Sequence, residues 1–500
     1  MASQVIEPPA SNRFATTRVL ALPLVFTLGL GAFLFVDSVR RNPSLVWTFA
    51  GIAAVLLAWN AVLLASTLRG HRTLTVELGL RKQHYLQACI QGSLLVYWGW
   101  YWREVYDSAY FIAAQLVFAY AFDMLLVWSR RDVYTLGFAP FPVVFSISFF
   151  LWFKPDWFYM QFLMVAVGFA AKELIRWDKD GRHVHVFNPS SFPLALFSLA
   201  LILTRTSDLT WGQDIATTLF YPPQMYLVLF LIGLPGQYLF GVTTMTMSAV
   251  LTTYAFGLLY YAATGIYFFY DSYIPIAVFL GMHLLFTDPA TSPRTELGRV
   301  IFGVLYGMST IALYAVLGHA GVPTFYDKLL QVPVLNVSIK LIDRAARSRW
   351  LRTLDPANIA KSLTPRRRHL AYMSVWAVVF ALMSAAQGVG DNHPGQWLPF
   401  WQQACAEGRP YACAYLENIM SSDCDRGSQW ACEEVAILQD HSDRYRPRSV
   451  ASATADEYQI ILRGSKGPIR ETSRARLTAL ACREGWPGAC DRRRDRGLWR

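Results

Sequence analysis

A short polar turn between two long apolar runs carries the side chains best suited to chemistry. The turn is Phe286-Thr287-Asp288-Pro289-Ala290-Thr291-Ser292-Pro293, and the apolar runs cover 274–286 and 300–317. Its prolines fix the backbone and remove N–H donors, so we expect a rigid turn that is not helical. The side chains in it that can hydrogen-bond are Thr287, Asp288, Thr291 and Ser292. They could cap the ends of a membrane hairpin, or they could hold a polar cofactor.

A second candidate segment is Arg182-His183-Val184-His185-Val186-Phe187-Asn188-Pro189. We expect His183 and His185 to face one side of an extended stretch, because side chains alternate along such a backbone. Imidazoles in this arrangement could ligate haem or a metal. A hydrogen-bonded structural role beside Asn188 is the interpretation that we favour, and we expect no metal.

The composition indicates a membrane protein. The chain has 500 residues, of which 54% are hydrophobic and only 16% are charged, whereas soluble domains carry about 25% charged residues. Long apolar runs recur from the first to the last third of the chain. The net charge of +11 could indicate nucleic-acid binding. Most Lys and Arg residues flank apolar runs instead, so we expect lipid and not nucleic acid as a partner.

We predict an all-α polytopic membrane protein with about thirteen spans. The predicted spans are roughly 18–38, 44–67, 88–102, 107–128, 140–153, 157–175, 190–204, 224–240, 243–264, 273–287, 299–318, 326–343 and 370–388. With the N-terminus in the cytoplasm, the inside segments carry far more Lys and Arg than the outside loops, as the positive-inside rule requires. This orientation in a bacterial inner membrane places everything after about residue 389 in the periplasm.

The predicted domain organisation follows the apolar runs and the charge. Its parts are a cytoplasmic segment 1–17, a polytopic membrane core 18–343, a basic cytoplasmic linker 344–369, an additional transmembrane helix 370–388 and an extracytoplasmic Cys-rich tail 389–500. The basic linker is an orientation signal facing anionic lipid, with docking of a cytoplasmic partner as the alternative.

The tail repeats the pattern C-x-x-G-x-x-x-A-C. It occurs at Cys405–Cys413, Cys424–Cys432 and Cys482–Cys490. Eight residues along one helix span about 12 Å, too far for a disulfide, but a glycine turn between two helices brings the sulfurs together. We therefore predict these three pairs, which imply an oxidising compartment. The alternative is a metal site, although the motifs contain no His and lack C-x-x-C spacing. The pattern resembles the Cys-paired variant of Sel1-like α/α repeats.

Four stretches resemble one membrane-protein family in their order along the chain. They are Arg182–Pro189, Gly236–Thr244, Thr287–Pro293 followed by Gly298-Arg299, and Leu329–Asp343. The family comprises the RnfD protein of Rnf electron-transport complexes and the NqrB protein of the sodium-pumping NADH:quinone reductase, including the UnbU-like branch. The resemblance is best over 183–345 and implies the family's helical core built from two inverted halves.

The resemblance also implies a flavin. In the family, a Thr in a periplasmic Ser-Gly-Ala-Thr sequence carries FMN through a phosphoester. Here the corresponding interval contains Asp214-Ile215-Ala216-Thr217, and Trp211 stands where the flavin transferase expects Asp. Ile215 removes the backbone freedom that Gly gives, so we expect no covalent attachment at Thr217. A noncovalent FMN or other flavin remains open, since Trp211 could stack on its ring.

Three functions compete on these observations. The first is a non-catalytic electron-transfer protein of an Rnf-like complex, which could carry a flavin and would have other membrane and extracytoplasmic subunits as partners. The second is a channel or transporter, because broken helices suit substrate sites at the membrane midplane. The third is an anchor that displays the repeat tail to an extracytoplasmic partner. The cofactor-binding candidates are Thr217, Trp211, Asn188, His185, Thr287, Asp288, Thr291 and Ser292.

Overall fold

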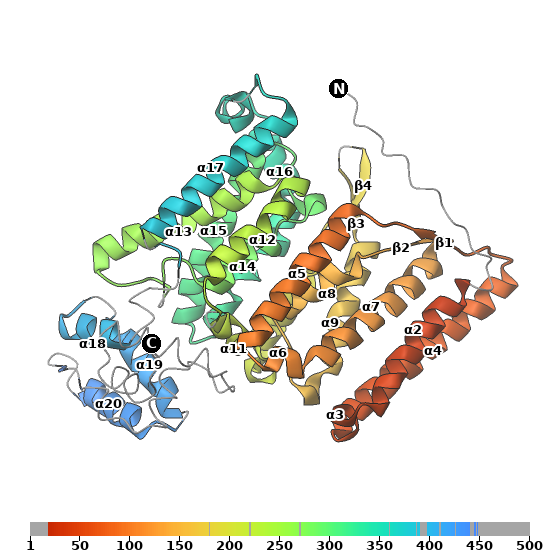
Figure 1. Ribbon diagram of the computed structural model, residues 1–500, viewed down its shortest axis with the longest axis horizontal. Helices are drawn as coiled ribbons and strands as arrows, with labels where there is room; N and C mark the ends of the chain where they lie inside the picture. Colours follow the sequence, from red (N-terminus) through yellow and green to blue (C-terminus); the bar gives the residue numbers. More distant parts are fainter. Residues whose placement is uncertain are drawn as a thin grey trace, which may run out of the picture.

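The computed structural model is mostly helical and describes residues 19–448 apart from positions 180, 220–221, 270–271, 360, 387, 391–397, 410–411, 426, 441–444 and 447 (Figure 1). The first helices are α2 (Ala21–Ala32), α3 (Asp37–Arg40), α4 (Pro43–Arg69), α5 (Lys82–Tyr101), α6 (Glu104–Asp107), α7 (Ala109–Arg130), α8 (Pro140–Ser148) and α9 (Tyr159–Leu174). The next are α10 (Ser191–Thr204), α11 (Gly212–Thr218), α12 (Met225–Phe240), α13 (Thr243–Thr264), α14 (Ile276–Leu284), α15 (Glu296–His319), α16 (Val332–Ala346) and α17 (Pro365–Ala385). The tail contributes α18 (Leu398–Ala406), α19 (Ala412–Asp425) and α20 (Gln429–Asp440).

Two small sheets correct the all-α prediction. Strand β1 (Thr75–Leu78) pairs in parallel with β2 (Val133–Leu136), so that Thr75 lies opposite Val133. Strand β3 (Arg176–Lys179) pairs antiparallel with β4 (Arg182–His185), so that Arg176 lies opposite His185. The second pair confirms the extended stretch predicted around the two histidines. Each strand lies next to a helix in the chain. Beyond the helix ends, pairing between two strands gives the backbone N–H and C=O groups their hydrogen-bond partners.

The polar segments that connect the helices lie at two opposite ends of the helices. In Figure 1 the four strands and the segment between α16 and α17 lie at one end, whereas α6, α11 and the tail helices lie at the other. Helix α17 runs between these ends and leads to α18. The basic segment 344–369 begins inside α16 and finishes inside α17, with short 3₁₀ turns at Leu351–Leu354 and Pro356–Asn358. The basic segments that flank the predicted spans thus gather opposite the tail.

Four helices are long and apolar enough to cross a membrane within the described part of the chain. They are Pro43–Arg69, Ala109–Arg130, Glu296–His319 and Pro365–Ala385. Three apolar helices are shorter: Ala21–Phe35, Ser191–Thr204 and Met225–Phe240. The prediction of about thirteen spans is therefore not supported. Several predicted spans are broken, and the nine-residue helices α8 and α14 reach only about 14 Å of a hydrocarbon core about 30 Å thick.

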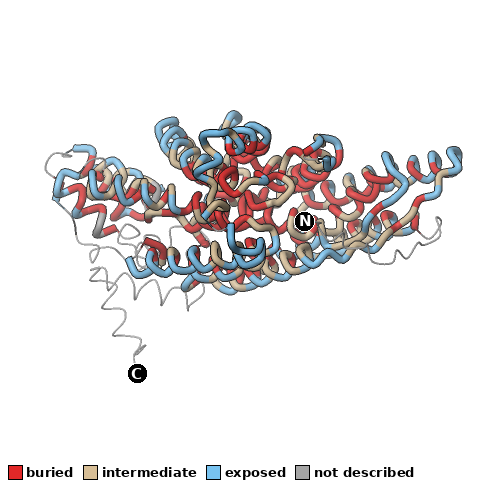
Figure 2. The backbone as a smooth tube through the Cα atoms, turned by 90° about the horizontal axis from the view of Figure 1, so that it is seen from above, coloured by how far each residue is buried: buried red, intermediate tan, exposed pale blue. Residues whose placement is uncertain are grey.

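The outer helices expose apolar side chains. Figure 2 shows buried residues concentrated in the centre of the molecule and exposed residues along its outer helices. All nine residues of α14 are buried, whereas only 17% of the apolar window of α17 is buried. Side chains such as Val62 on α4 and Val378 on α17 are more than half exposed. Exposed apolar side chains on long helices are typical of helices that face lipid.

Close packing joins α13 to α15 through two glycines four residues apart. A Cβ atom on Gly303 would collide with Ser248 Oγ and the Met245 backbone oxygen, and one on Gly307 would lie 2.9 Å from the Ala249 oxygen. Small residues at this spacing allow two helix backbones to approach closely, as in membrane helix pairs. This contact holds the start of α15, and with it the Thr287–Pro293 turn, against the core.

The tail forms two disulfide-bonded hairpins in its described part. Bonds join Cys405 to Cys413 and Cys424 to Cys432, with Cα–Cα distances of 4.6 and 4.7 Å. Gly408 (φ 67°) and Gly427 (φ 100°) reverse the chain between each pair, as the spacing predicted. Two of the three predicted pairs are thereby confirmed. The third, Cys482–Cys490, lies outside the described residues.

Candidate functional site

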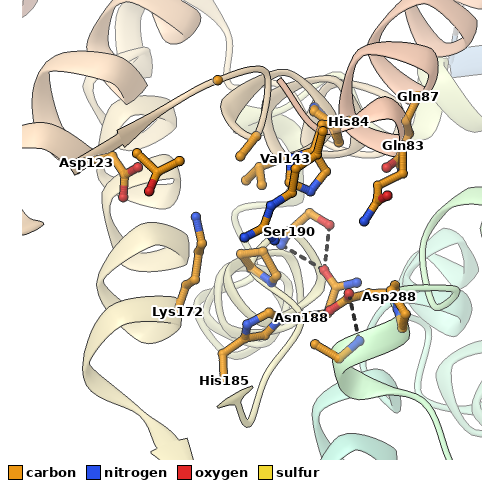
Figure 3. A pocket seen from close by; sticks show the side chains of 18 of the residues that line it. Gln83, His84, Gln87, Asp123, Val143, Lys172, His185, Asn188, Ser190 and Asp288 are labelled. Atoms are coloured by element: carbon orange, nitrogen blue, oxygen red, sulfur yellow. Dashed lines mark hydrogen bonds and ion pairs between the residues drawn. The ribbon is translucent and has the colours of Figure 1, made fainter. Parts of the chain in front are cut away.

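A cavity of about 430 Å³ lies at the end of the helices where the strands gather (Figure 3). Its wall combines the residues before and within the first turns of α5, the C-terminal ends of α7 and α9, and the segments that follow β4 and α14. Three of the predicted site residues line it, namely His185, Asn188 and Asp288. The volume is within the range of about 300–1,000 Å³ that small-molecule sites occupy.

His185 and Asp288 form an ion pair at one side of the cavity. The His185 Nε2 and Asp288 Oδ2 atoms are 2.9 Å apart, and both side chains are about four-fifths buried. Asp288 also accepts hydrogen bonds from the Ala290 N–H at 3.1 Å and the Thr291 hydroxyl at 3.1 Å. Burial alone would raise the pKa of Asp288, but His185 and these donors bring it below its usual value. The carboxylate is therefore ionised, with His185 and two donors of its own turn as partners.

Asn188 connects the histidine strand to the helices behind it. Its Oδ1 accepts from the Ser190 N–H at 2.9 Å, the Ser190 hydroxyl at 2.8 Å and the Ser191 N–H at 3.1 Å, which caps the start of α10. Its Nδ2 donates to the Leu285 carbonyl at 3.0 Å, and its backbone N–H donates to Asn336 Oδ1 at 3.1 Å. These bonds agree with the structural role that the sequence favours for this segment.

The remaining polar residues of the turn serve the turn itself. The Thr287 hydroxyl donates to the His283 carbonyl at 3.2 Å and closes the end of α14. The Ser292 hydroxyl donates to the Asp288 carbonyl at 2.6 Å, and Asn336 Nδ2 donates to the Thr291 carbonyl at 3.3 Å. None of the three turn side chains lines the cavity. The contacts of Thr287, Thr291 and Ser292 therefore agree with the interpretation that these residues cap the turn.

The charges around the cavity are unevenly paired. Glu173 lies within 4.0 Å of three guanidinium groups, those of Arg130, Arg131 and Arg176. By contrast, Arg81 and Lys172 have no acidic partner and no hydrogen bond within the part of the chain that the structure describes. The ammonium group of Lys172 lies 5.3 Å from the centre of the Phe169 ring. The lining of the cavity holds Arg81, Arg131, Lys172 and Arg176 against Asp123, Glu173 and Asp288, so positive charge is in excess.

His84 responds to this excess of positive charge. It lies in the first turn of α5, and Figure 3 shows it on the opposite side of the cavity from Lys172. Burial, together with the nearby charges of Arg81 and Lys172, lowers the pKa of His84 to about 4. Its imidazole is therefore neutral at pH 7, and an anion placed beside it would favour protonation.

Thr217 and Trp211 lie far from this cavity, at the opposite end of the helices (Figure 1). The Thr217 hydroxyl donates to the backbone oxygens of Gln213 and Asp214 within helix α11. Ile215 is 1% exposed and packed in the core. Lys154 lies 5.4 Å from the centre of the Trp211 ring and occupies one of its faces. These residues do not fit a covalently attached FMN, and the predicted cofactor set is split between two places.

The sequence did not identify the basic side of the cavity. Arg81, His84 and Lys172 flank apolar runs, and flanking charges also arise simply as orientation signals. Only the folded chain brings the start of α5 to the end of α9. A group of three or more His, Cys, Asp or Glu side chains able to hold a metal ion is absent from the described residues. The histidine pair is split, since His183 faces Asp178 at 3.4 Å and His185 faces Asp288.

Comparison with protein-family models, with curated proteins and with solved structures gave no match. The fold and the site define a helical protein with a charged cavity at one end, disulfide-bonded hairpins in its tail and, among the residues that the structure describes, four potential membrane spans. The resemblance to the RnfD and NqrB proteins rests on the sequence motifs alone.

Proposed function

We propose that this chain is an integral membrane component of an electron-transport complex, similar to the RnfD protein of Rnf complexes, which binds a flavin noncovalently in the charged cavity. One observation carries the proposal: all four stretches of the resemblance contribute to the cavity or to its immediate support. Asn188, Phe240 and Asp288 line it, and Asn336 hydrogen-bonds to the segments of Asn188 and Thr291. These four stretches lie far apart in the chain, and local structure alone does not require them to meet at one cavity.

The lining suits a polar ring system of moderate size. The amide side chains of Gln83 and Gln87 can hydrogen-bond to a heterocyclic edge, while Val143, Phe240 and Leu284 provide apolar contact. A bound flavin would supply the redox chemistry, and the protein would orient it and limit its contact with water. Neighbouring membrane and extracytoplasmic subunits would deliver and remove the electrons.

The proposed location is a bacterial inner membrane, with the cavity end in the cytoplasm and the tail in the periplasm. The gathering of the basic segments at the cavity end supports this orientation (Figure 1). Disulfides in the tail at the other end support it independently, since they form in oxidising compartments.

Thiol labelling of intact cells tests the orientation. We expect a membrane-impermeant maleimide to label the tail cysteines after reduction and to leave Ile359→Cys unlabelled until the membrane is permeabilised. Ile359 is 91% exposed in the basic segment, so its thiol would be accessible from its own side. Cys89→Ala removes the background thiol in both proteins. Labelling of the tail and of residue 359 from the same side would refute the orientation.

Absorbance of the purified protein tests the flavin. We expect a flavin spectrum that leaves the protein on denaturation, and no fluorescent band in a denaturing gel. Ile215 and Trp211 break the sequence needed for covalent attachment, and Thr217 is bonded within its own helix. A fluorescent band that disappears in Thr217→Val would contradict noncovalent binding. Protein that neither carries nor rebinds flavin would overturn the flavin proposal.

The second candidate function is a membrane anchor that displays a periplasmic repeat domain. The two disulfide-bonded hairpins favour it, because helices α18–α20 stack through short glycine turns as Sel1-like repeats do. In that case the tail would bind a protein partner, and the loss of flavin from the core would leave this binding intact. A channel or transporter is the remaining alternative, for which the charged cavity would be a substrate site.

A further inference from the structure

We propose that the cavity binds a phosphate monoester, with the phosphate group held between Arg81, His84 and Lys172. The inference deepens the proposed function, and it rests on that function in taking this cavity as the ligand site. It concerns the anionic part of the ligand and does not require that the remainder be a flavin.

Charge pairing in the wall directs an anion to this side of the cavity. Two of the three acidic groups in the wall have a cationic partner, since Glu173 faces three arginines and Asp288 faces His185. The third, Asp123, accepts a hydrogen bond from the neutral Tyr134 hydroxyl at 3.1 Å and lies on the same side of the cavity as Lys172 (Figure 3). Arg81 and Lys172 lack such partners among the residues that the structure describes. A dianion would therefore be attracted by these two cations, and Asp123 is the one carboxylate of the wall without a cationic partner that would oppose it.

The types of donor favour a phosphate over a carboxylate. A guanidinium group binds two oxygens through its fork of N–H groups, an ammonium group acts as a compact point charge, and an imidazole N–H adds one further donor. A phosphate monoester offers three terminal oxygens to match three such groups, whereas a carboxylate offers two. Figure 3 shows Lys172 and His84 reaching into the cavity from two different helices, α9 and α5.

The rest of the wall leaves room for the organic part of the ester. Gln83 and Gln87 lie beside His84 and have no hydrogen-bond partner within the described residues. Val143 and Leu284 present apolar surface. The ester could be a soluble compound that enters from the cytoplasm, or phosphatidic acid from the adjoining leaflet, and both carry the same headgroup chemistry.

Binding of phenyl phosphate to the full-length protein tests the inference. The protein is reconstituted in phosphatidylcholine nanodiscs, and its affinity for phenyl phosphate is measured by calorimetry at pH 7, with benzyl alcohol as the uncharged probe. We expect phenyl phosphate to bind and benzyl alcohol not to bind. Arg81→Met and Lys172→Met should each weaken binding about 10- to 100-fold, the value of a charged hydrogen bond. Lys172→Arg should retain most of the affinity.

Lys361→Met is the matched control, because it removes one exposed positive charge from the basic segment without touching the cavity. We expect it to leave the affinity unchanged. Arg81 is itself exposed, so Arg81→Met decides the question even where Lys172→Met fails to fold. Failure of wild-type protein to bind phenyl phosphate, or an equal loss in Lys361→Met, would overturn the inference.

Two further arms separate the sources and the two proposals. Nanodiscs containing phosphatidic acid should weaken the binding of phenyl phosphate if the lipid is the occupant, and should leave it unchanged if the ester is soluble. Protein that binds phenyl phosphate but no flavin would refute the flavin proposal alone. Protein that binds flavin equally well in Lys172→Met and ignores phenyl phosphate would refute the anion inference alone.

Discussion

Asn188→Ala should destabilise the protein by about 3–5 kcal/mol, because it leaves the Ser190 N–H, the Ser190 hydroxyl and the Ser191 N–H without their buried acceptor. The Leu285 carbonyl keeps the Ser191 hydroxyl as a donor at 3.2 Å. Its oxygen accepts from two backbone N–H groups and one hydroxyl at the start of α10, and its amide donates to the Leu285 carbonyl at the end of α14. Each buried polar group left without a partner costs about 1–3 kcal/mol. The measurement is thermal unfolding of the protein in detergent, with a fall of several degrees expected.

Asn60→Ala is the matched control for this substitution. Asn60 on α4 also donates two hydrogen bonds, to Thr27 and to the Leu56 carbonyl, but it lies only partly buried. We expect its loss to change the stability by less than about 1 kcal/mol. Asn188→Asp keeps the three accepted hydrogen bonds and places an oxygen against the Leu285 carbonyl. Its loss of stability should therefore lie between those of Asn188→Ala and Asn60→Ala. Equal melting temperatures for Asn188→Ala and wild type would show that the network does not hold these segments together.

The extended histidine stretch and the proline turn could be predicted because their determinants are local. Pro289 and Pro293 exclude helix wherever they occur, and Asp288 caps the 3₁₀ turn Pro289–Thr291 through the Ala290 N–H as its position suggests. The spacing of Cys and Gly in the tail is equally local, since eight residues and one glycine decide whether two sulfurs can meet.

The number of membrane spans could not be predicted from apolar runs. Helix α14 is only nine residues long and wholly buried, yet the run 273–287 around it is as apolar as a true span. Hydropathy reports burial in lipid and burial in protein alike, and broken helices are tolerated where protein covers their ends. The run therefore predicted burial correctly and length incorrectly.

The basic side of the cavity was inaccessible to sequence reasoning for a different reason. Arg81 precedes α5 and Lys172 lies in the last turn of α9, about ninety positions apart in the chain, a separation for which no local pattern exists. Their shared lack of acidic partners is a property of the fold. Asn188 and Asp288 were found because prolines adjoin both, which marks them in the sequence, whereas a lysine at the end of a helix is ordinary.

Peptide mapping of the nonreduced protein should recover Cys405 linked to Cys413, Cys424 linked to Cys432, and Cys482 linked to Cys490. The first two pairs follow from hairpins in which a positive-φ glycine reverses the chain. The third is expected because the same Gly and Ala occupy the same offsets in 482–490. Fifteen pairings are open to six cysteines, so recovery of these three is a stringent result. A peptide joining Cys413 to Cys424 would refute the hairpin arrangement.

Loss of either described bridge should destabilise the tail by about 2–3 kcal/mol, the chain-entropy value for so short a loop. The double substitution of Cys405 and Cys413 by Ser should therefore speed limited proteolysis of the tail in the full-length protein. Changing Cys89 to Ser is the control, because that cysteine is free and lies on α5. The described tail helices bury a small set of large side chains, namely Leu398, Trp401, Leu416, Met420, Trp430 and Leu438, so we expect the bridges to supplement a small core. Proteolysis that is unchanged by removal of a bridge would show that helix packing alone holds the hairpins.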